Sequence, residues 1–460
     1  MIIDDTINPS DLKPQLEKFW RLSGAKIQDI EKNYDHQKGS PVFTVKGKYT
    51  TRGWTEWTQG FEYGSAVLQY DATGDDQALE FGRRNTVEKM AEHVGHFGVH
   101  DHGFNNLSTY GNLLRLMQEG KIPANQWEKD FYELAIKLSG AVQAKRWTQV
   151  KDGTGYIYSF NGPHSLFVDT IRTIRILMVS HWLGHSLMDD NDLKVSLLSR
   201  AIQHAINTAK FAVYYGEGRD GFDEWGRTAH ESIFNTNDGN FRCPNAQQGF
   251  SGYTTWTRGL SWAMLGFAEE LEALEFLKDA DLQEFGGLEK VREIFLKAAR
   301  ATCDFFISHT ASDGIPYWDA GAPNLHRLGN YQEKPSDPYN DFEPIDSSAA
   351  AIGAQGLLRL GNYLKSQKDK EYLKYWQAGL TSVKTLLSAP YLSEDPGHQG
   401  LILHSIYHQP NGWDHVPEGS KVANGESSMW GDYHARELML YVQRVAEEKK
   451  YLTYFGCLDL

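Results

Sequence analysis

A repeating series of amphipathic helices restricts the fold of this sequence more than any other feature. Apolar residues recur at helical spacing in about a dozen segments. These segments are joined alternately by short polar turns and by long loops rich in Gly, Trp, Tyr and His. Strand-like patterns are short and confined to those loops. The clearest predicted helices span residues 11–34, 75–94, 131–147, 166–188, 193–214, 253–277, 288–309, 347–367, 370–388 and 426–448.

This alternation predicts an all-α fold, an (α/α)6 barrel of helical hairpins with long active-site loops at one end. In such a barrel the inner helices point their loop-proximal ends into a shared pocket. An open α-solenoid is the alternative, but no 34- or 40-residue sequence period supports one. No linker or low-complexity segment divides the chain, so we expect a single catalytic domain over 1–460, with an N-terminal helix and loop, 1–50, packed on the barrel.

Charge and cysteine content limit the kinds of partner. The formal net charge of −14 argues against binding of nucleic acid or of an anionic membrane surface, so an anionic substrate requires a local basic or hydrogen-bonding pocket. The three cysteines, Cys243, Cys303 and Cys457, fit reduced thiols better than a disulfide framework. With no signal peptide and no run of 18 apolar residues, we expect a soluble cytoplasmic protein, monomer or homodimer, or a periplasmic one if a signal peptide was removed.

The stretch 248–270, QGFSGYTTWTRGLSWAMLGFAEE, is predicted to be a loop that becomes a helix. Thr254 or Thr255 is suited to cap the helix N-terminus. Gly259, Ala263 and Gly266 lie at i, i+4 and i+7, which gives a stripe of small residues that lets a neighbouring helix approach closely.

The same stretch carries the side chains of a candidate sugar site. Trp256 and Trp262 would cover the apolar face of a sugar, Arg258 would meet a carboxylate, and Gln248 would bond hydroxyls. Alternatively, this is a core helix with two packed tryptophans and a surface arginine.

Two aspartates occur at predicted loop-to-helix junctions in aromatic, His-rich surroundings. Asp101 lies in GVHDHGFNN and Asp169 in HSLFVDTIRTIRILM. Two carboxylates that face one cavity split their pKa values, which suits general acid–base chemistry, and we expect the pKa of Asp169 to be raised. The alternatives are that each is a helix N-cap, or that Arg172 holds Asp169.

His100 and His230 are candidates for orienting substrate or water, although a single histidine is commonly a structural residue. The run His100–Asp101–His102 resembles part of a metal site, but no third histidine follows at helical spacing and no HExxH or Cys cluster occurs, so no metal site is predicted. The serine-hydrolase, P-loop and dinucleotide-binding motifs are also missing from the sequence.

Several motifs, in order along the chain, resemble glycoside hydrolase family 88, the unsaturated glucuronyl hydrolases. The run QGFSGYTTWTRGLSWAMLGF is similar to the family's HQGYSDxSxWxRGQAWGxYGF. Further similar motifs are HDHGF at 100–104, VDTIRTIRILM at 168–178, SDGIPYWDAGAP at 312–323, DSSAAAIGAQGLLRL at 346–360 and WGDYHARELML at 430–440. The resemblance covers roughly residues 50–445. Leu260 replaces the Gln of RGQAW, TIRIL replaces NLPLL, and the segment GWDHVPEGSKVANGESS is unlike the shorter family loop.

The resemblance implies an (α/α)6 barrel with Asp169 as the acid/base carboxylate and Asp101 as the second essential aspartate. It also implies that His230 and Gln248 orient the substrate and that Trp256 and Arg258 line the pocket. The expected activity is removal of a 4,5-unsaturated glucuronic acid from the non-reducing end of lyase-generated oligosaccharides, with no metal or organic cofactor. The alternatives are an exo-acting glycosidase on saturated β-glucuronides that uses an Asp/Asp general acid/base pair, and a catalytically silent sugar-binding barrel.

Overall fold

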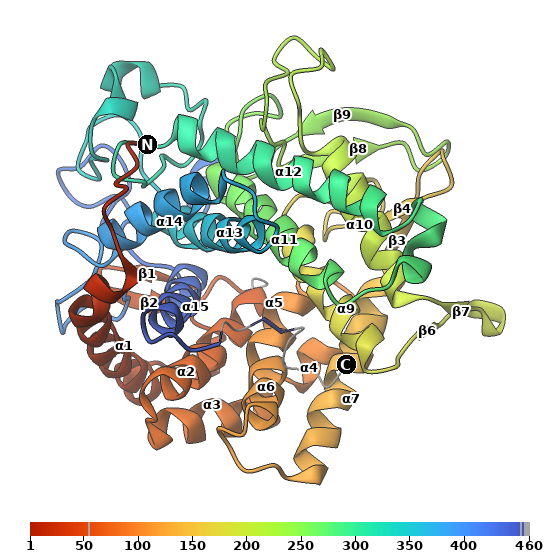
Figure 1. Ribbon diagram of the computed structural model, residues 1–460. Coiled ribbons are helices and arrows are strands. Elements are labelled where there is room, and N and C mark those ends of the chain that lie inside the picture. The colour runs from red at the N-terminus through yellow and green to blue at the C-terminus, as the bar shows by residue number, and fades with distance from the viewer. Residues whose placement is uncertain (54–55, 451–452, 455–460) are drawn as a thin grey trace.

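The fold is a ring of helices around a central axis, seen in a computed structural model that describes residues 1–53, 56–450 and 453–454 (Figure 1). Within those residues, six inner positions close a ring, because each inner element packs on the next and α15 packs on α2. The inner elements are α2 (Gln59–Thr73), α5 and α6 (His102–Asn106 and Asn112–Gln118, joined by a π-helical turn at Leu107–Gly111), α8 and α9 (Thr170–Thr173 and Arg175–Trp182), α11 (Thr257–Leu274), α13 (Ser347–Ser366) and α15 (Met429–Ala446).

An outer layer of helices covers this ring and makes the structure the predicted (α/α)6 barrel. Its members are α1 (Lys13–Asn33), α3 (Asp76–Lys89), α7 (Gln126–Lys145), α10 (Leu197–Phe211), α12 (Leu288–His309) and α14 (Tyr372–Leu386). One further short helix, α4, spans Ala91–Val94. The inner helices are buried around most of their circumference; every residue of α11 is buried.

Strands in the described residues are short and lie in the loops. Two hairpins pair β1 (Phe43–Val45) with β2 (Lys48–Thr50) and β3 (Trp147–Gln149) with β4 (Gly155–Ile157). A three-stranded antiparallel sheet has the order β5 (Ser165–Phe167), β8 (Glu231–Phe234), β9 (Phe241–Asn245), and a small hairpin pairs β6 (Leu187–Met188) with β7 (Lys194–Val195). The β5–β8 pairing brings the residue before Asp169 next to His230, whose carbonyl accepts from the Val168 N–H at 2.9 Å.

Two details of the predicted helices are wrong. The segment 166–188 is not one helix: it begins as β5, and the helix forms only after Asp169 and is interrupted at Ile174. Neither Thr254 nor Thr255 caps α11, because the Thr254 hydroxyl donates to Asp319 and the Thr255 hydroxyl accepts from the Thr228 N–H; Trp256 occupies the N-cap position.

Glycines bring the inner helices together near the site. A Cβ on Gly103 would lie 2.1 Å from the carbonyl oxygen of Thr173, so α5 contacts the backbone of α8 directly. A Cβ on Gly266 would lie 2.6 Å from Ile171, which confirms the close approach predicted from the small-residue stripe of α11. The N-termini of α5, α8 and α11 therefore converge at one end of the barrel.

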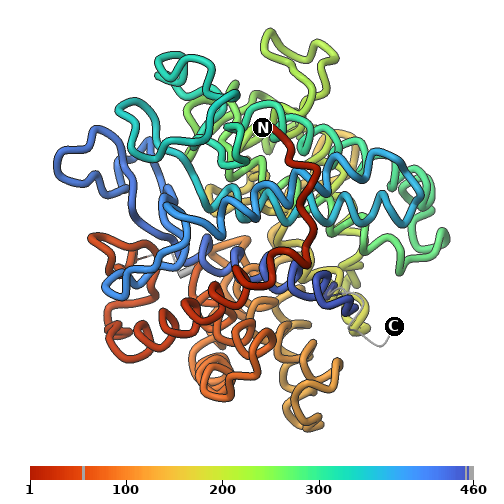
Figure 2. The backbone as a smooth tube through the Cα atoms, turned by 60° about the vertical axis from the view of Figure 1, so that its left-hand side comes forward, coloured from red at the N-terminus to blue at the C-terminus, as the bar shows by residue number. Residues whose placement is uncertain are grey.

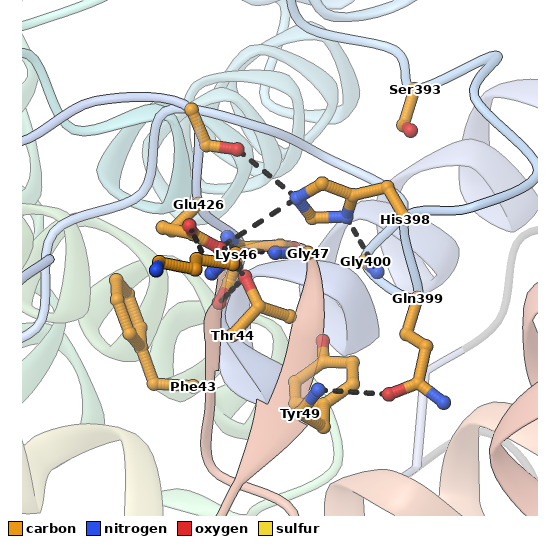
Figure 3. Close-up of polar contacts among 12 residues, drawn as sticks. Phe43, Thr44, Lys46, Gly47, Tyr49, Ser393, His398, Gln399, Gly400 and Glu426 are labelled. Carbon is orange, nitrogen blue, oxygen red and sulfur yellow. Dashed lines mark hydrogen bonds and ion pairs between the residues drawn. The ribbon is translucent and has the colours of Figure 1, made fainter. Parts of the chain in front are cut away.

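The N-terminal segment packs against the barrel wall. Its first residues cross the outside of the barrel before α1 (Figure 2), where Ile2 N donates to Ser312 O and Asp4 N to the Thr381 hydroxyl, both at 3.0 Å. The β1–β2 hairpin is tied to the loop before α15 (Figure 3): Glu426 accepts from the Thr44 hydroxyl at 2.6 Å and from Lys46 N at 2.7 Å.

The free cysteines agree with the expectation of thiols: Cys243 is exposed and Cys303 buried, while Cys457 lies outside the described residues. Within the part of the chain that the structure describes, no helix is long and apolar enough to cross a membrane.

Candidate active site

A cavity of about 200 Å³ opens at the end of the barrel where the long loops gather. Its lining unites residues from the whole length of the chain: Trp57, Val99, His100, Asp101, Phe104, Phe160, Phe167, Asp169, Gln247, Gln248, Trp256, Arg258, Trp262, Tyr407, His408, Asn411 and Trp413. A larger surface groove, about 720 Å³, lies between α1, α2 and the end of α15, but it contains none of these groups. The smaller cavity, with two carboxylates under an aromatic wall, is the candidate active site.

Asp101 and Asp169 occupy the N-cap positions of α5 and α8, yet neither side chain makes a capping hydrogen bond. Both are nearly buried, at 7% and 8% exposure, and both line the cavity. The N-cap alternative from the sequence is therefore wrong for both carboxylates, which are left available to a ligand.

Arg172 does not hold Asp169. Its guanidinium lies 2.9 Å from Glu269 and donates to Glu437 at 2.7 Å, deeper in the barrel. This removes the second structural explanation for the position of Asp169.

His100 lies between the two aspartates. Its Nε2 atom is 3.6 Å from Asp169 Oδ1 and 3.9 Å from Asp101 Oδ1, and the ring is buried beside Phe160 and Phe167. Neither ring nitrogen makes a hydrogen bond to any described residue. One imidazole thus lies between the two carboxylates without a hydrogen bond to either.

The pKa values of Asp101, Asp169 and His100 do not all shift in the same direction. Burial raises the pKa of Asp101; the charge of His100 opposes this rise without cancelling it. Burial also acts to raise the pKa of Asp169, but His100 and His230 outweigh it and the net pKa is lowered. Burial acts to lower the pKa of His100, and the two carboxylates reverse the effect, so that its pKa is raised. The prediction of a raised pKa for Asp169 is therefore wrong, because the sequence did not reveal the histidine beside it.

His230 has a fixed tautomer. Its Nδ1 atom accepts from the backbone N–H groups of Gln247, at 3.0 Å, and Gln248, at 3.4 Å. The neutral ring must then carry its proton on Nε2, which makes no hydrogen bond to a described residue. Burial lowers the pKa of His230 to about 4, so the ring stays neutral and Nε2–H is a donor. His230 contacts the pocket-lining rings of Trp256 and Phe167 rather than lining the cavity itself.

Arg258 lines the cavity, but its guanidinium is engaged by the protein. It donates to the carbonyls of Ile406 and Tyr407 and to Gln248 Oε1, the last at 2.7 Å. Asp346 lies 3.7 Å from it. The arginine is therefore a support for the pocket wall, and the surface arginine that the sequence alternative expected is buried instead.

Because Arg258 holds the Gln248 oxygen, Gln248 offers its amide N–H groups to a ligand. This gives the site a donor whose orientation the protein determines, and His230 Nε2–H is a second oriented donor beside the pocket-lining rings of Trp256 and Phe167. Such donors suit an acceptor such as a carboxylate, a hydroxyl oxygen or water.

Aromatic rings form the rest of the pocket. Trp256 and Trp262 both line it as expected, and Trp262 packs on Phe104 with centroids 4.8 Å apart. Sequence reasoning missed Trp57, Phe160, Phe167 and the loop residues Tyr407, His408, Asn411 and Trp413. The only sequence signal for that loop is its local richness in His, Tyr and Trp, which many loops of this chain share.

The described His, Cys, Asp and Glu side chains form no group of three or more placed to hold a metal ion. The arrangement has the components of an acid–base site: two carboxylates with an imidazole between them, oriented N–H donors and stacking surfaces for a sugar.

These features define the class of the protein, an (α/α)6-barrel enzyme with a carboxylate pair at the loop-rich end. Comparison with known proteins supports this. The unsaturated glucuronyl hydrolase of Bacillus sp. (strain GL1) is 28% identical over 408 residues, covering 86% of this chain and 89% of the relative. The unsaturated chondroitin disaccharide hydrolase of Streptococcus pyogenes serotype M1 is 24% identical over 427 residues, covering 90% of this chain and 88% of the relative. No protein-family model matches the chain.

The crystal structure of the Bacillus sp. GL1 enzyme superposes with a TM-score of 0.70 at 23% identity and covers 94% of this chain and 97% of that one, which confirms the fold. The resemblance expected from the motifs is also confirmed: the chain is similar along most of its length to unsaturated glucuronyl hydrolases.

Proposed function

We propose that the protein is a glycoside hydrolase that removes 4,5-unsaturated glucuronic acid from the non-reducing end of oligosaccharides left by polysaccharide lyases. The observation that carries the proposal is the pair of buried, non-capping aspartates in a pocket walled by aromatic rings. The similarity along most of the chain to enzymes named for this activity supports it.

The chemistry is hydration of a vinyl ether. Asp169 delivers a proton to C4 of the unsaturated ring, and positive charge develops at C5 and the ring oxygen. Water adds to C5 while Asp169, now a carboxylate, takes the proton that the water loses. The resulting hemiketal opens and releases the rest of the oligosaccharide.

The other groups bind and orient. Trp256 and Trp262 provide flat apolar surfaces against the sugar, while Gln248 and His230 supply N–H donors to its carboxylate or to the attacking water. Burial raises the pKa of Asp101, which makes it easier for this carboxylate to take up a proton and donate a hydrogen bond once the uronate is bound. This matters because the substrate is itself an anion.

The test uses unsaturated disaccharides prepared with a chondroitin lyase. We expect the ultraviolet absorbance of the C4=C5 bond to disappear when the protein is added, and a protein with both Asp101→Asn and Asp169→Asn to leave it unchanged. Persistent absorbance across disaccharides from several lyases, with release of glucuronate from a saturated β-glucuronide, would overturn the proposal in favour of a conventional exo-glycosidase.

The other two hypotheses are less well supported. The relatives act on unsaturated sugars, as their names state, which fits the main proposal and not a saturated β-glucuronide. A silent sugar-binding barrel would have no need for two buried carboxylates without structural partners, since burying such groups costs folding free energy.

A further inference from the structure

His100 is a buried histidine for which the vinyl ether chemistry above has no use. It is 1% exposed, yet neither ring nitrogen has a hydrogen-bond partner among the described residues. A buried polar group without a partner costs about 1–3 kcal/mol, so its presence between two carboxylates calls for a role. Its Nε2 atom faces Asp169 Oδ1 at 3.6 Å and Asp101 Oδ1 at 3.9 Å.

We propose that His100 holds the proton that Asp169 delivers to the substrate, and so acts as a positioning residue that loads the acid without contacting the sugar. The inference rests on the proposed function, because it concerns how the same site is supplied with its proton. It differs from the interpretation of His100 as a substrate-binding residue.

The geometry supports direct transfer. Nε2 is 3.6 Å from Asp169 Oδ1, about half an ångström beyond an ordinary hydrogen bond. Contacts of this kind are commonly long without substrate and shorten in the complex. Phe160 and Phe167 flank the ring and keep water from it, and the Thr173 hydroxyl donates to the His100 carbonyl at 2.9 Å, which fixes the backbone.

The protons balance over one cycle. In the resting site the imidazolium carries the proton and Asp169 is a carboxylate. The proton passes from Nε2 to Oδ1, leaving neutral His100 and a neutral acid, and the acid then protonates C4. When water adds at C5, Asp169 takes its proton and returns it to Nε2. No other reactant is needed.

The surrounding charges favour this resting state. The negative charges of Asp101 and Asp169 raise the pKa of His100 despite burial. Other titratable or charged groups near the three residues come from several elements: Arg146 at the end of α7, His96 in the loop before α5, His204 on α10, His230 just before β8 and Arg258 on α11. Burial lowers the pKa of His204 to about 3 and that of His230 to about 4, so neither adds a competing charge near neutral pH.

The kinetic test is His100→Gln. We expect kcat to fall at least ~10-fold, the lower range for lost acid–base help, with KM within about threefold of wild type. The alkaline limb of the kcat profile should move to lower pH, because the proton is then held by a carboxyl of ordinary pKa 3.8 instead of an imidazole of 6.5. His185→Asn, a change remote from the pocket, is the control and should leave the profile unchanged.

Two kinetic outcomes would overturn the proposal. A raised KM with kcat unchanged would make His100 a substrate-binding residue, and an unchanged kcat and pH profile would leave it without a role in the proton supply.

A second measurement does not depend on activity. In protein with ¹⁵N-labelled histidine, NMR titration should give one buried imidazole with a pKa above 6.5, which falls in both Asp101→Asn and Asp169→Asn. A pKa of His100 below 6.5 in the wild type would overturn the proposal even if the enzyme consumes unsaturated uronates. Conversely, a raised pKa in a protein that leaves those sugars intact would overturn the proposed function, and with it the proton-supply role.

Discussion

At the scale of single residues, the carboxylates of the candidate active site are distinguished from other aspartates because they lack structural hydrogen bonds. An aspartate at a helix N-cap normally accepts from the first backbone N–H groups, as Asp75 and Asp346 do in this chain. Asp101 and Asp169 occupy the same position without those bonds. The position places each carboxylate at the mouth of the barrel, and the missing cap bonds leave it free for a ligand.

We predict that Asp169→Asn lowers turnover of an unsaturated disaccharide by at least ~10²-fold, a usual loss when a general acid–base is removed. Because Asp169 caps nothing, the melting temperature should change little. Steady-state kinetics and thermal unfolding of the same preparation check this. Near-normal turnover in a well-folded variant would show that another group is the acid.

Arg258 is predicted to act through Gln248. Arg258→Lys cannot keep the bonds to Ile406 O, Tyr407 O and Gln248 Oε1 together, since a lysine lacks the planar fork. We expect a stability loss of about 1.5–3 kcal/mol, the usual contribution of a hydrogen bond to a charged group, and a lower kcat/KM.

A double-mutant cycle with Gln248→Ala separates this role from direct carboxylate binding. If Arg258 orients Gln248, the two losses in kcat/KM should overlap, so that the double variant is little worse than Gln248→Ala. Fully additive losses would mean that Arg258 meets the substrate independently.

At the scale of elements, helices with a strong apolar period were predictable and the functional loops were not. The helices over 288–309 and 347–366 agree with the expected ranges almost to the residue. The prediction of one helix over 166–188 was wrong because the first residues of this segment pair with β8, some 65 residues further on. Local periodicity carries no signal for that pairing. The loop-to-helix junctions at Asp101 and Asp169 could be predicted because each depends on residues that are neighbours in the sequence.

Two of the three departures from the family pattern concern α11 and the loop that follows His404. Leu260 is 1% exposed and packs in the core, away from the cavity lining. The residues that reach the cavity are Tyr407, His408, Asn411 and Trp413, which precede most of the segment 412–428 that is unlike the family loop. Asp414 accepts from His408 N at 2.9 Å and helps to hold this loop in place.

We therefore predict that Trp413→Ala changes kcat/KM for some lyase-derived disaccharides by about tenfold relative to others, equivalent to about 1.4 kcal/mol. Leu260→Gln should instead lower stability by about 2–4 kcal/mol, because it buries an amide in the core, and leave the ranking unchanged. Kinetics on a disaccharide panel, with the exposed Trp127→Ala as control, checks both. An unchanged ranking in Trp413→Ala would show that the loop only covers a helix end.

At the scale of the whole molecule, closing the ring buries charge as well as apolar surface. Below the aspartates, Arg172, Arg175 and Arg359 meet Glu269, Glu272 and Glu437 from four different inner positions. Arg175, which lies in TIRIL where the family carries NLPLL, points into this cluster, and so does Arg172, just before that motif. The sequence could not reveal it, since its members are up to 265 residues apart.

Glu270 belongs to the same region but has no partner: it is fully buried and neither carboxyl oxygen makes a hydrogen bond to a described residue. Burial raises its pKa from 4.5 to about 8, and the charge of Glu269 adds to the rise. The folded state therefore keeps a proton that the unfolded chain loses above pH 4.5. The contribution to stability is fully present below pH 4.5 and is lost as the pH rises towards 8.

We predict that the free energy of unfolding of the wild type falls between pH 5 and pH 8 and that Glu270→Gln flattens this dependence. The amide resembles the protonated acid in shape and never ionises, so the variant should match the wild type at pH 5 and be more stable at pH 8, by at most ~4 kcal/mol. Denaturant unfolding at both pH values measures the difference, with the exposed Glu284→Gln as control. A variant less stable than the wild type at pH 8 would show that Glu270 is ionised and paired in the folded protein, and that the closed end of the barrel accommodates its charge.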